Sequence, residues 1–173
     1  DRVSHTQKTG HSPVEALGLS RGGIGTKIHL VTDGSGLPLA FTLTPGQRHE
    51  MSAFERTLEA VHLPGLRGRP RTRPKYLAGD KACSYRLICA YLRRRRIRPV
   101  IPPRQGGNMG KGSRDASILI STAAHAIKRC VGWLKGCRSI ATRHENLAVN
   151  FGAMLKLAFR RQYLRTLRPS DRT

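Results

Sequence analysis

The alternation of apolar and polar positions near the start of the chain predicts a β-hairpin. The segments KIHLVT, residues 27–32, and LAFTL, residues 39–43, place apolar side chains at every second position, as strands with one buried face do. The sequence DGSG lies between them, and its glycines can adopt the positive φ angles that tight hairpin turns require. We therefore predict two antiparallel strands joined by a short turn.

A helical period follows the hairpin. In MSAFERTLEAV, residues 51–61, apolar side chains recur at Phe54, Leu58 and Val61, which is the i, i+4, i+7 spacing of one helix face. Residues 1–20 are polar with little periodicity, which is typical of a loop or a frayed edge.

The second half of the chain combines short strands with longer helices. A short strand that ends at Asp80 is followed by a helix in YRLICAYLRRRRI, residues 85–97, and by another short strand in RPVIPP. Longer helices are predicted from about Ile118 to Lys135 and from about Leu147 onward. The apolar stripe expected on the first of them consists of Ala123, Ile127, Cys130, Val131 and Leu134. The order strand, strand, helix, strand, helix, strand, helix, helix predicts a mixed α/β layered domain.

The charge balance narrows the choice of partner. The chain has 173 residues, with 32 Lys and Arg against 10 Asp and Glu, and a formal net charge of +22. Such a field attracts polyanions, so nucleic acid is the expected partner and an anionic membrane surface is the weaker alternative. No apolar run approaches the roughly 20 residues of a membrane-spanning helix, and the start of the chain lacks the apolar segment of a secretory signal. Because the first residue is not Met, Asp1 is expected to be internal to a longer product.

The four cysteines indicate reduced thiols. Cys83, Cys89, Cys130 and Cys137 contain no C-x-x-C pair. A helix would place Cys130 and Cys137 two turns apart, which is too far for a disulfide. A cytosolic location is therefore expected, and a metal–thiolate site is not favoured.

Four separated stretches resemble one known family. They are LGLSRGGIGTKIHLVTDGSGLPLAFTLTPGQRHE, GRPRTRPKYLAGDKACS, RPVIPP and RCVGWLKGCRSIATRHENLAVNFGAMLKLAF, in that order. They are similar to the catalytic domain of bacterial insertion-sequence transposases of the DDE type. The resemblance implies a ribonuclease-H-like fold of a mixed sheet flanked by helices, with the first strand incomplete. It divides the chain into a partial N-terminal segment (1–20), an incomplete catalytic domain (21–168) and a tail (169–173).

The resemblance also implies a chemistry and a location. Members of this family cut the ends of a mobile DNA element and join them to target DNA, and two Asp and one Glu hold two divalent ions, usually Mg²⁺ and alternatively Mn²⁺. Paired metals can activate the attacking oxygen and stabilise the leaving oxygen of a phosphodiester displacement. Duplex DNA in the bacterial cytoplasm, at the nucleoid, is the implied partner. A homodimer is compatible with the full-length product.

Two aspartates are candidates for the metal ligands. Asp80 lies in LAGDKACS, which matches the second-aspartate motif of the family, although an Asp ahead of a helix can also act as its N-terminal residue. Asp1 is the only Asp before SRGG, so it is either the first ligand or a solvated terminus with the true ligand further upstream.

The third acid is replaced in this chain. The family motif is Tyr, two residues, Arg, three residues, Glu, six residues, Lys, and it lies on one helix face. Lys135 matches the Lys, whereas Lys128, Ala124 and Ser121 stand at the Glu, Arg and Tyr positions. An ammonium group cannot ligate Mg²⁺, so we expect the two-metal site to fail and this copy to be inactive. The alternatives are that Glu145 substitutes for the lost acid, or that the match is displaced by one turn and Lys128 lies on a solvated face.

The basic side chains indicate an interface for phosphate groups. Arginine pairs with phosphate through two parallel hydrogen bonds, and many such contacts give salt-sensitive binding of DNA without regard to sequence. Recognition of the element's ends is expected from a module upstream. The candidate residues are Arg67, Arg69, Arg71, Arg73, Arg93, Arg94, Arg95, Arg96, Arg129, Lys135, Arg138 and Arg143.

Aromatic residues make up only 5% of the chain, so base stacking on single strands is not favoured. Trp133 is expected to be a partly buried anchor. Three interpretations of the chain remain: a transposase catalytic domain, a non-catalytic DNA-binding remnant of such a domain, and a basic protein of ribosomal or nucleoid type. The third is disfavoured because it does not explain the four motif stretches.

Overall fold

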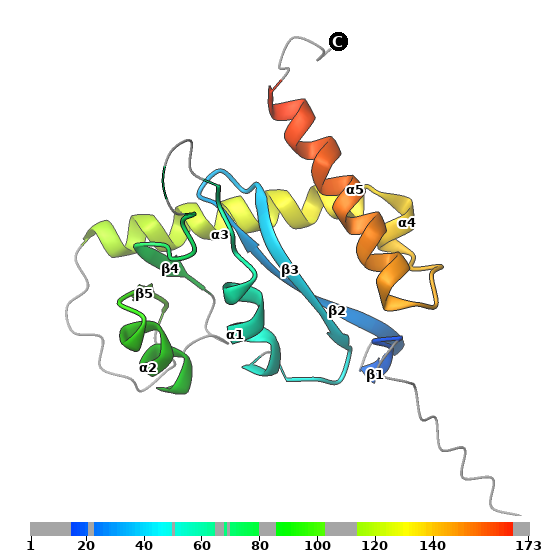
Figure 1. The fold of residues 1–173 in the computed structure, drawn as a ribbon, viewed down its shortest axis with the longest axis horizontal. Helices are drawn as coiled ribbons and strands as arrows, with labels where there is room; N and C mark the ends of the chain where they lie inside the picture. Colours follow the sequence, from blue (N-terminus) through cyan, green and yellow to red (C-terminus); the bar gives the residue numbers. More distant parts are fainter. Residues whose placement is uncertain are drawn as a thin grey trace, which may run out of the picture.

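The computed structural model describes residues 15–20, 23–49, 51–64, 68, 70–79, 86–102 and 114–167, the first four of the last range by backbone alone. Three antiparallel strands come first, and two parallel strands and five helices follow or intervene (Figure 1). The elements are β1 (Gly18–Ser20), β2 (Gly23–Thr32), β3 (Pro38–Pro45), α1 (Met51–Glu59), β4 (Tyr76–Ala78), α2 (Arg86–Arg94), β5 (Arg98–Val100), α3 (Arg114–Lys135), α4 (Arg138–Ala141) and α5 (Ala148–Leu167). The α/β class is therefore as the sequence predicts.

The hairpin turn is fixed by a carboxylate and a glycine. Asp33 Oδ1 accepts hydrogen bonds from the backbone amides of Ser35 (2.9 Å) and Leu37 (2.8 Å), which closes the turn between β2 and β3. Gly36 has a φ of 89°, and a Cβ built there would lie 2.7 Å from the carbonyl oxygen of Ala126. The backbone of α3 therefore packs directly on this turn, and only glycine fits.

The β2–β3 hairpin is buried on both faces. On one face, Phe41 and Leu43 pack against helices α3 to α5, and Phe41 meets Phe159 edge to face with ring centroids 5.5 Å apart. On the other face, Ala40 packs towards α1, and Thr57 Oγ1 donates to Thr42 Oγ1 at 2.9 Å. The hairpin is thus the middle layer, between α1 and α5 in Figure 1.

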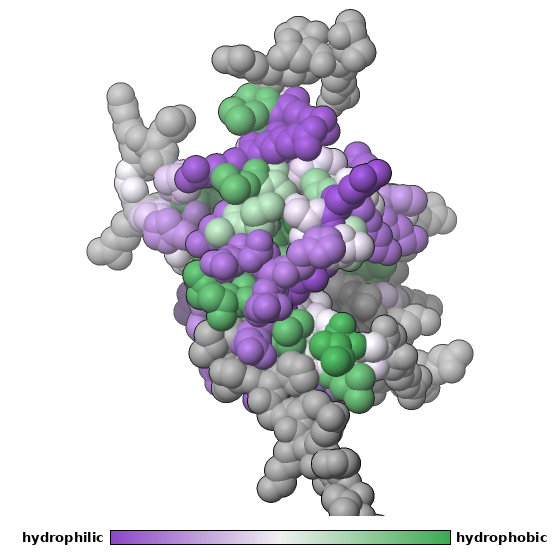
Figure 2. Space-filling view, turned by 90° about the vertical axis from the view of Figure 1, so that its right-hand side faces the viewer, coloured by the Kyte–Doolittle hydropathy of each residue, from purple (hydrophilic) through white to green (hydrophobic). Residues whose placement is uncertain are grey.

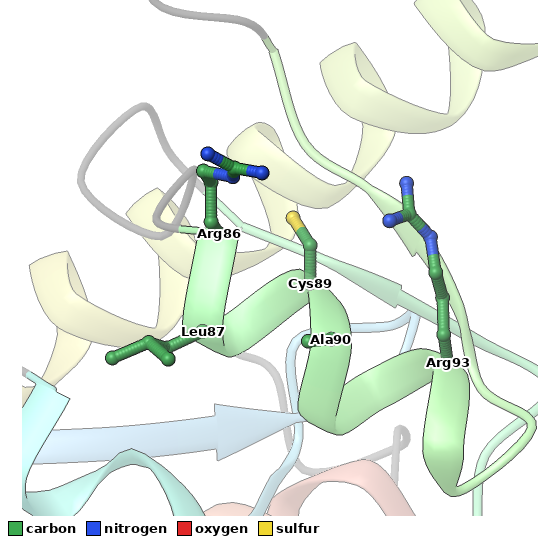
Figure 3. A pocket seen from close by; sticks show the side chains of 5 residues that line it. All are labelled: Arg86, Leu87, Cys89, Ala90 and Arg93. Atoms are coloured by element: carbon green, nitrogen blue, oxygen red, sulfur yellow. The ribbon is translucent and has the colours of Figure 1, made fainter.

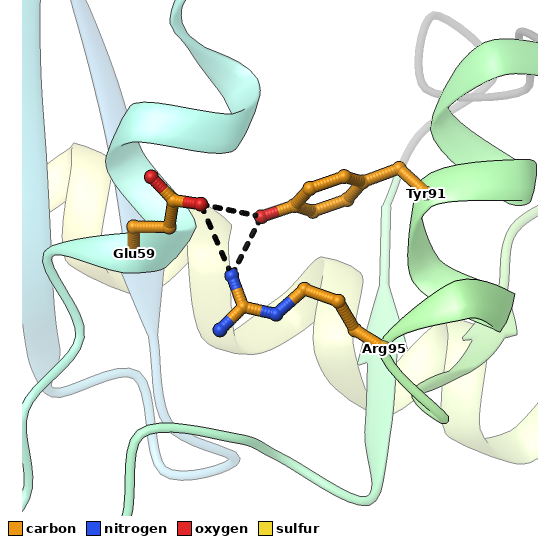
Figure 4. Close-up of polar contacts among 3 residues, drawn as sticks. All are labelled: Glu59, Tyr91 and Arg95. Carbon is orange, nitrogen blue, oxygen red and sulfur yellow. Dashed lines mark hydrogen bonds and ion pairs between the residues drawn. The ribbon is translucent and has the colours of Figure 1, made fainter.

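The β4–α2–β5 unit joins this layer through α1 and α3. Leu77 of β4 packs on the same apolar cluster as Ala40 and Leu58. Figure 4 shows the polar link: Tyr91 Oη donates to Glu59 Oε1 (3.2 Å), and Arg95 Nη1 donates to both (2.7 Å and 3.3 Å). Helix α3 contacts β2, β4 and β5, so it spans both sheets.

Most of the predicted elements are confirmed, and several points need correction. Residues Gly18–Ser20, which lie in the segment predicted as a loop, form the strand β1 and pair with β2. The sequence did not indicate this strand because three residues are too few to show a period. The four-residue α4 is also an addition. Helix α3 begins at Arg114, before the predicted start near Ile118.

The buried stripe of α3 is rotated from the predicted one. Ile127 and Val131 are exposed, whereas Ala126, Cys130 and Leu134 are buried. The reason is the contact of Ala126 with the hairpin turn, which sets the rotation of the helix. Trp133 is half-buried against the same cluster, which confirms the prediction of a partly buried anchor.

No helix in the described part of the chain is long and apolar enough to cross a bilayer.

The two faces of α5 predict opposite results for two neighbouring leucines. Leu155 is 0% exposed and Leu157 is 59% exposed. We expect Leu155→Ala to lower the free energy of unfolding by about 2–5 kcal/mol, because it leaves a cavity beside Phe151 and Phe159. Leu157→Ala, the matched control, should change it by less than about 0.5 kcal/mol. Urea denaturation measures both, and equal losses would contradict the position of α5.

Candidate nucleic-acid interface

The predicted metal ligands Asp1 and Asp80 lie outside the described residues, as do Arg67 and Arg69. Their roles stay predictions. Within the described ranges no group of three His, Cys, Asp or Glu side chains is placed to hold a metal ion.

Lys128 lies on the solvent face of α3. It stands two residues from both Ala126 and Cys130, and a step of two residues turns a helix by about 200° away from the buried stripe. Ser121, Ala124, Lys128 and Lys135 are all exposed. The four motif positions therefore share one face, as their spacing predicts, and that face points away from the core.

Glu145, the alternative third acid, lies in the loop after α4. Its carboxylate accepts a hydrogen bond from Asn150 Nδ2 at 3.4 Å, and its backbone carbonyl accepts one from Arg143. The contact with Asn150 ties Glu145 to the start of α5, and its role as third acid stays an alternative.

A set of exposed cations lies along α2 and on the two segments that hydrogen-bond near its C-terminal end. Hydrogen bonds hold its segments together: Arg98 N donates to the carbonyl of Lys75 (3.0 Å), and Arg73 Nη1 donates to the carbonyl of Arg95 (3.4 Å). We call this set the α2 basic surface, and it consists of Arg71, Arg73, Lys75, Arg86, Arg93, Arg94, Arg96 and Arg98, all exposed. The candidates named from the sequence do not include Lys75, Arg86 or Arg98, although Arg86 stands seven residues before Arg93 on a predicted helix.

The outer face of α2 is hollowed between two of these arginines. Arg86, Cys89 and Arg93 recur at i, i+3, i+7 and point to the same side in Figure 3, with Leu87 and Ala90 beside them. Two guanidinium groups thus present their donors to solvent from one helix face, in the arrangement that suits contact with phosphate oxygens.

Arg95 differs from its neighbours because it faces inward. Its guanidinium pairs with Glu59 at 3.3 Å and, like that of Arg94, lies 5.6 Å from the centroid of the Tyr91 ring. Both side chains of the Glu59–Arg95 pair are partly exposed, so solvent weakens their attraction and the pair adds little to the stability of the fold. Its main effect is to position α2 against the end of α1.

Arg96 adopts the left-handed conformation that glycine usually provides at the end of a helix. Its φ is 57°. Arg96 N donates to the carbonyl of Arg93 (2.9 Å), and Ile97 N donates to that of Leu92 (2.8 Å), the two bonds of a Schellman motif. A side chain in this conformation costs about 1–2 kcal/mol, a cost that glycine at this position would not carry.

Arg143 does not belong to the exposed cations. Its guanidinium is half-buried, lies 4.9 Å from the centroid of the Phe151 ring and donates hydrogen bonds from all three of its nitrogens. Burial lowers the pKa of this guanidinium, and the charges of Glu15 and Glu145 act against that shift. The acceptors are the carbonyls of Glu145 (2.7 Å), Glu15 (2.7 Å) and Asn146 (2.8 Å), and the hydroxyl of Thr26. These bonds give Arg143 a structural role, because the side chain ties the α4–α5 loop to β2 and to the segment before β1. Its contact with phosphate stays a prediction.

The remaining predicted cations are open to solvent. Arg129 Nη2 donates to the carbonyl of Ser35 at 3.4 Å and stays exposed, as do Lys135 and Arg138. They lie on α3 and α4, apart in sequence from the α2 basic surface.

Comparison with known proteins places the chain in a family. The model for the transposase DDE domain matches residues 4–129. A proposed transposase for insertion sequence element IS402 of Burkholderia cepacia is 31% identical over 170 residues, which cover 96% of this chain and 73% of that protein. No solved structure matches. The chain therefore belongs to the DDE transposases of insertion sequences, a family that acts on DNA and generally uses divalent metal ions.

The substitution Arg96→Gly is expected to change the stability of the protein and its affinity for DNA in opposite directions. Arg96→Gly should raise the free energy of unfolding by about 0.5–1 kcal/mol, because it relieves the left-handed conformation. It should also weaken binding to a duplex oligonucleotide, because one cation is removed. Arg93→Gly, the matched control, lies in helical conformation and should lower stability by about 1 kcal/mol. Thermal unfolding and fluorescence anisotropy measure the two effects.

Two arginines near α4 are expected to differ in how much they contribute to stability. Arg143→Ala should lower the free energy of unfolding by about 1–3 kcal/mol, because it leaves several carbonyls without their donor. Arg138→Ala, an exposed site, should leave stability within about 0.5 kcal/mol. Denaturation curves compare the variants, and a neutral Arg143→Ala would contradict the structural role.

Proposed function

We propose that this chain is a transposase domain that binds duplex DNA through the α2 basic surface and lacks strand cleavage because Lys128 replaces the metal-binding glutamate. The observation that carries the proposal is the convergence of three exposed basic segments around α2, held together by backbone and side-chain hydrogen bonds. Membership of the family supports DNA as the substrate, and the α2 basic surface is the site where we propose that DNA binds.

The physical basis of binding is counterion release. Arginines that neutralise phosphates displace condensed cations, so the logarithm of the affinity falls linearly with the logarithm of salt, with a slope of about −0.9 per phosphate. The formal charge of +22 adds long-range attraction. Contacts of this kind carry no base sequence, so selection of the element's ends belongs to another module. Such binding would occur at the bacterial nucleoid.

The family implies a metal site, and its residues can be compared with the ligands that a divalent ion needs. Divalent ions of the Mg²⁺ class take oxygen ligands, and a carboxylate at position 128 would supply one. Lys128 supplies an ammonium group instead, which repels the ion and offers it no lone pair. The residues at the matched positions therefore do not fit a two-metal site, and we derive no cleavage step for this chain.

A ribonuclease-H-like arrangement is the fold we propose within the α/β class. The chain order supports it: an antiparallel hairpin is followed by α1, then by β4 and β5 in parallel with α2 between them. The core around Leu58 and Leu92 joins both sheets, which suits one continuous layer of strands.

One experiment tests the metal part of the proposal. Mn²⁺ is titrated calorimetrically into the unmodified chain and into its Lys128→Glu and Lys135→Glu variants. We expect heat of binding for Lys128→Glu alone, because Lys135→Glu makes the same charge change on the same helix face, two turns away. All three should fold, since both lysines are exposed. Lys128→Glu would still lack transposition, because Ser121 and Ala124 also depart from the motif.

The same proteins test DNA binding and cleavage on a supercoiled plasmid and a labelled duplex. The expected result for the unmodified chain is affinity that falls steeply with salt and no nicking in Mg²⁺ or Mn²⁺. Metal-dependent nicking by the unmodified chain would return it to the active enzymes and show that another carboxylate, such as Glu145, completes the site. A preference for structured RNA over the duplex would contradict the DNA assignment.

A further inference from the structure

Helix α5 carries apolar side chains on both of its faces. The inner face buries Phe151, Leu155 and Phe159 against the sheet. The outer face exposes Leu157 by 59% and Leu164 by 61%. Because Leu157 and Leu164 stay exposed, no element within the described residues covers this part of the outer face.

The outer face has the spacing of a helix–helix seam. Ala153, Leu157, Arg160, Leu164 and Leu167 follow one another at intervals of 4, 3, 4 and 3 residues, and all five are exposed. Alternation of three and four keeps side chains on one line and lets them interlock with a second helix. We call this line the α5 seam. Leu167, at its end, is 76% exposed.

The charged side chains of α5 that lie beside the seam are all positive. Lys156 and Arg161 flank it, and Arg165 adjoins Leu164. The α5 sequence, AVNFGAMLKLAFRRQYLRTL, contains no Asp or Glu. Figure 2, which faces the side of the molecule on which α5 lies, shows apolar residues interspersed with strongly polar ones. Flanking charges of this kind select the partner of a helix pair.

The position of Arg160 disfavours a second copy of this chain. Arg160 is the middle residue of the five, so both the parallel and the antiparallel two-fold pairings of the seam would place it opposite its own copy. Lys156 and Arg161 would meet like charges in addition. Like charges opposed in a helix pair are destabilising, whereas a carboxylate opposite Arg160 would form a charge-assisted hydrogen bond.

We propose that the α5 seam is a docking site for an acidic amphipathic helix of another protein. The partner's apolar residues would pack on Leu157 and Leu164, and its Glu or Asp side chains would pair with Arg160 and the flanking cations. This surface lies on the last helix and is separate from the α2 basic surface proposed for DNA.

The probe for this site is a fluorescein-labelled synthetic helix of three heptads. It carries Leu at its seam positions, Glu beside them and one Glu opposite Arg160. A scrambled peptide of identical composition, with the leucines spread around the helix, is the control for charge. In fluorescence anisotropy at physiological salt, we expect the patterned peptide to bind about tenfold more tightly than the scrambled one.

Two variants locate the contact on α5. Leu157→Ser/Leu164→Ser should abolish the preference between the peptides, whereas Leu19→Ser/Ile118→Ser, exposed positions on β1 and α3, should preserve it. Arg160→Glu should weaken the patterned peptide about tenfold, and a peptide with Lys at the opposing position should recover that loss. Equal binding of the two peptides, or a preference that survives the leucine changes, would overturn the proposal.

Two further measurements separate the other occupants of the seam. A dimer of the protein alone in sedimentation, dissociated by Leu157→Ser/Leu164→Ser, would assign the seam to a second copy and overturn the proposal. A tenfold loss of duplex affinity in that variant would assign it to DNA. We expect a monomer and unchanged duplex affinity.

Discussion

Burial of the β2–β3 hairpin on both faces is the constraint on which the rest of the structure depends. Phe41 and Leu43 need a cover on one side and Ala40 and Thr42 on the other. Helix α1, which follows the hairpin directly, and helices α3 to α5, which come much later in the chain, therefore converge on one pair of strands. The close contact of Gly36 with Ala126 sets the rotation of α3. That rotation decides which residues of α3 are buried and which face solvent.

The same rotation would separate the proposed loss of the catalytic acid at position 128 from the stability of the fold. Lys128 points to solvent, so an exchange of carboxylate for ammonium there breaks no apolar contact of the core. A reversal of charge at a buried position would leave an unpaired ion and unfold much of the domain. A copy that has lost its third acid can thus keep its core and its DNA-binding surface, which is the combination that we propose.

The basic side chains fall into two groups, those that have internal partners and those that are exposed to solvent. Arg143 and Arg95 are drawn inward, where carbonyls, a carboxylate and aromatic rings satisfy them, and they hold loops and helices in place. The arginines of the α2 basic surface stay in solvent, and Arg96 does so at the cost of a left-handed backbone. In a sequence these groups look alike, because a run of cations does not tell which of them has a partner.

The sequence by itself determined the secondary elements whose side chains repeat with a clear period, and it determined the family through its motif stretches. The hairpin, α1, α2 and the last helix follow from local spacing, since the polypeptide geometry converts each period into a face. It also determined that Lys128, Lys135 and their motif partners share one face. Only the tertiary structure decided that this face is the solvent face, that Ile127 is exposed while Ala126 is buried, and that Arg143 is structural. Those outcomes depend on contacts between residues far apart in the chain, such as Arg143 with Glu15 and Gly36 with Ala126, and no local pattern encodes them.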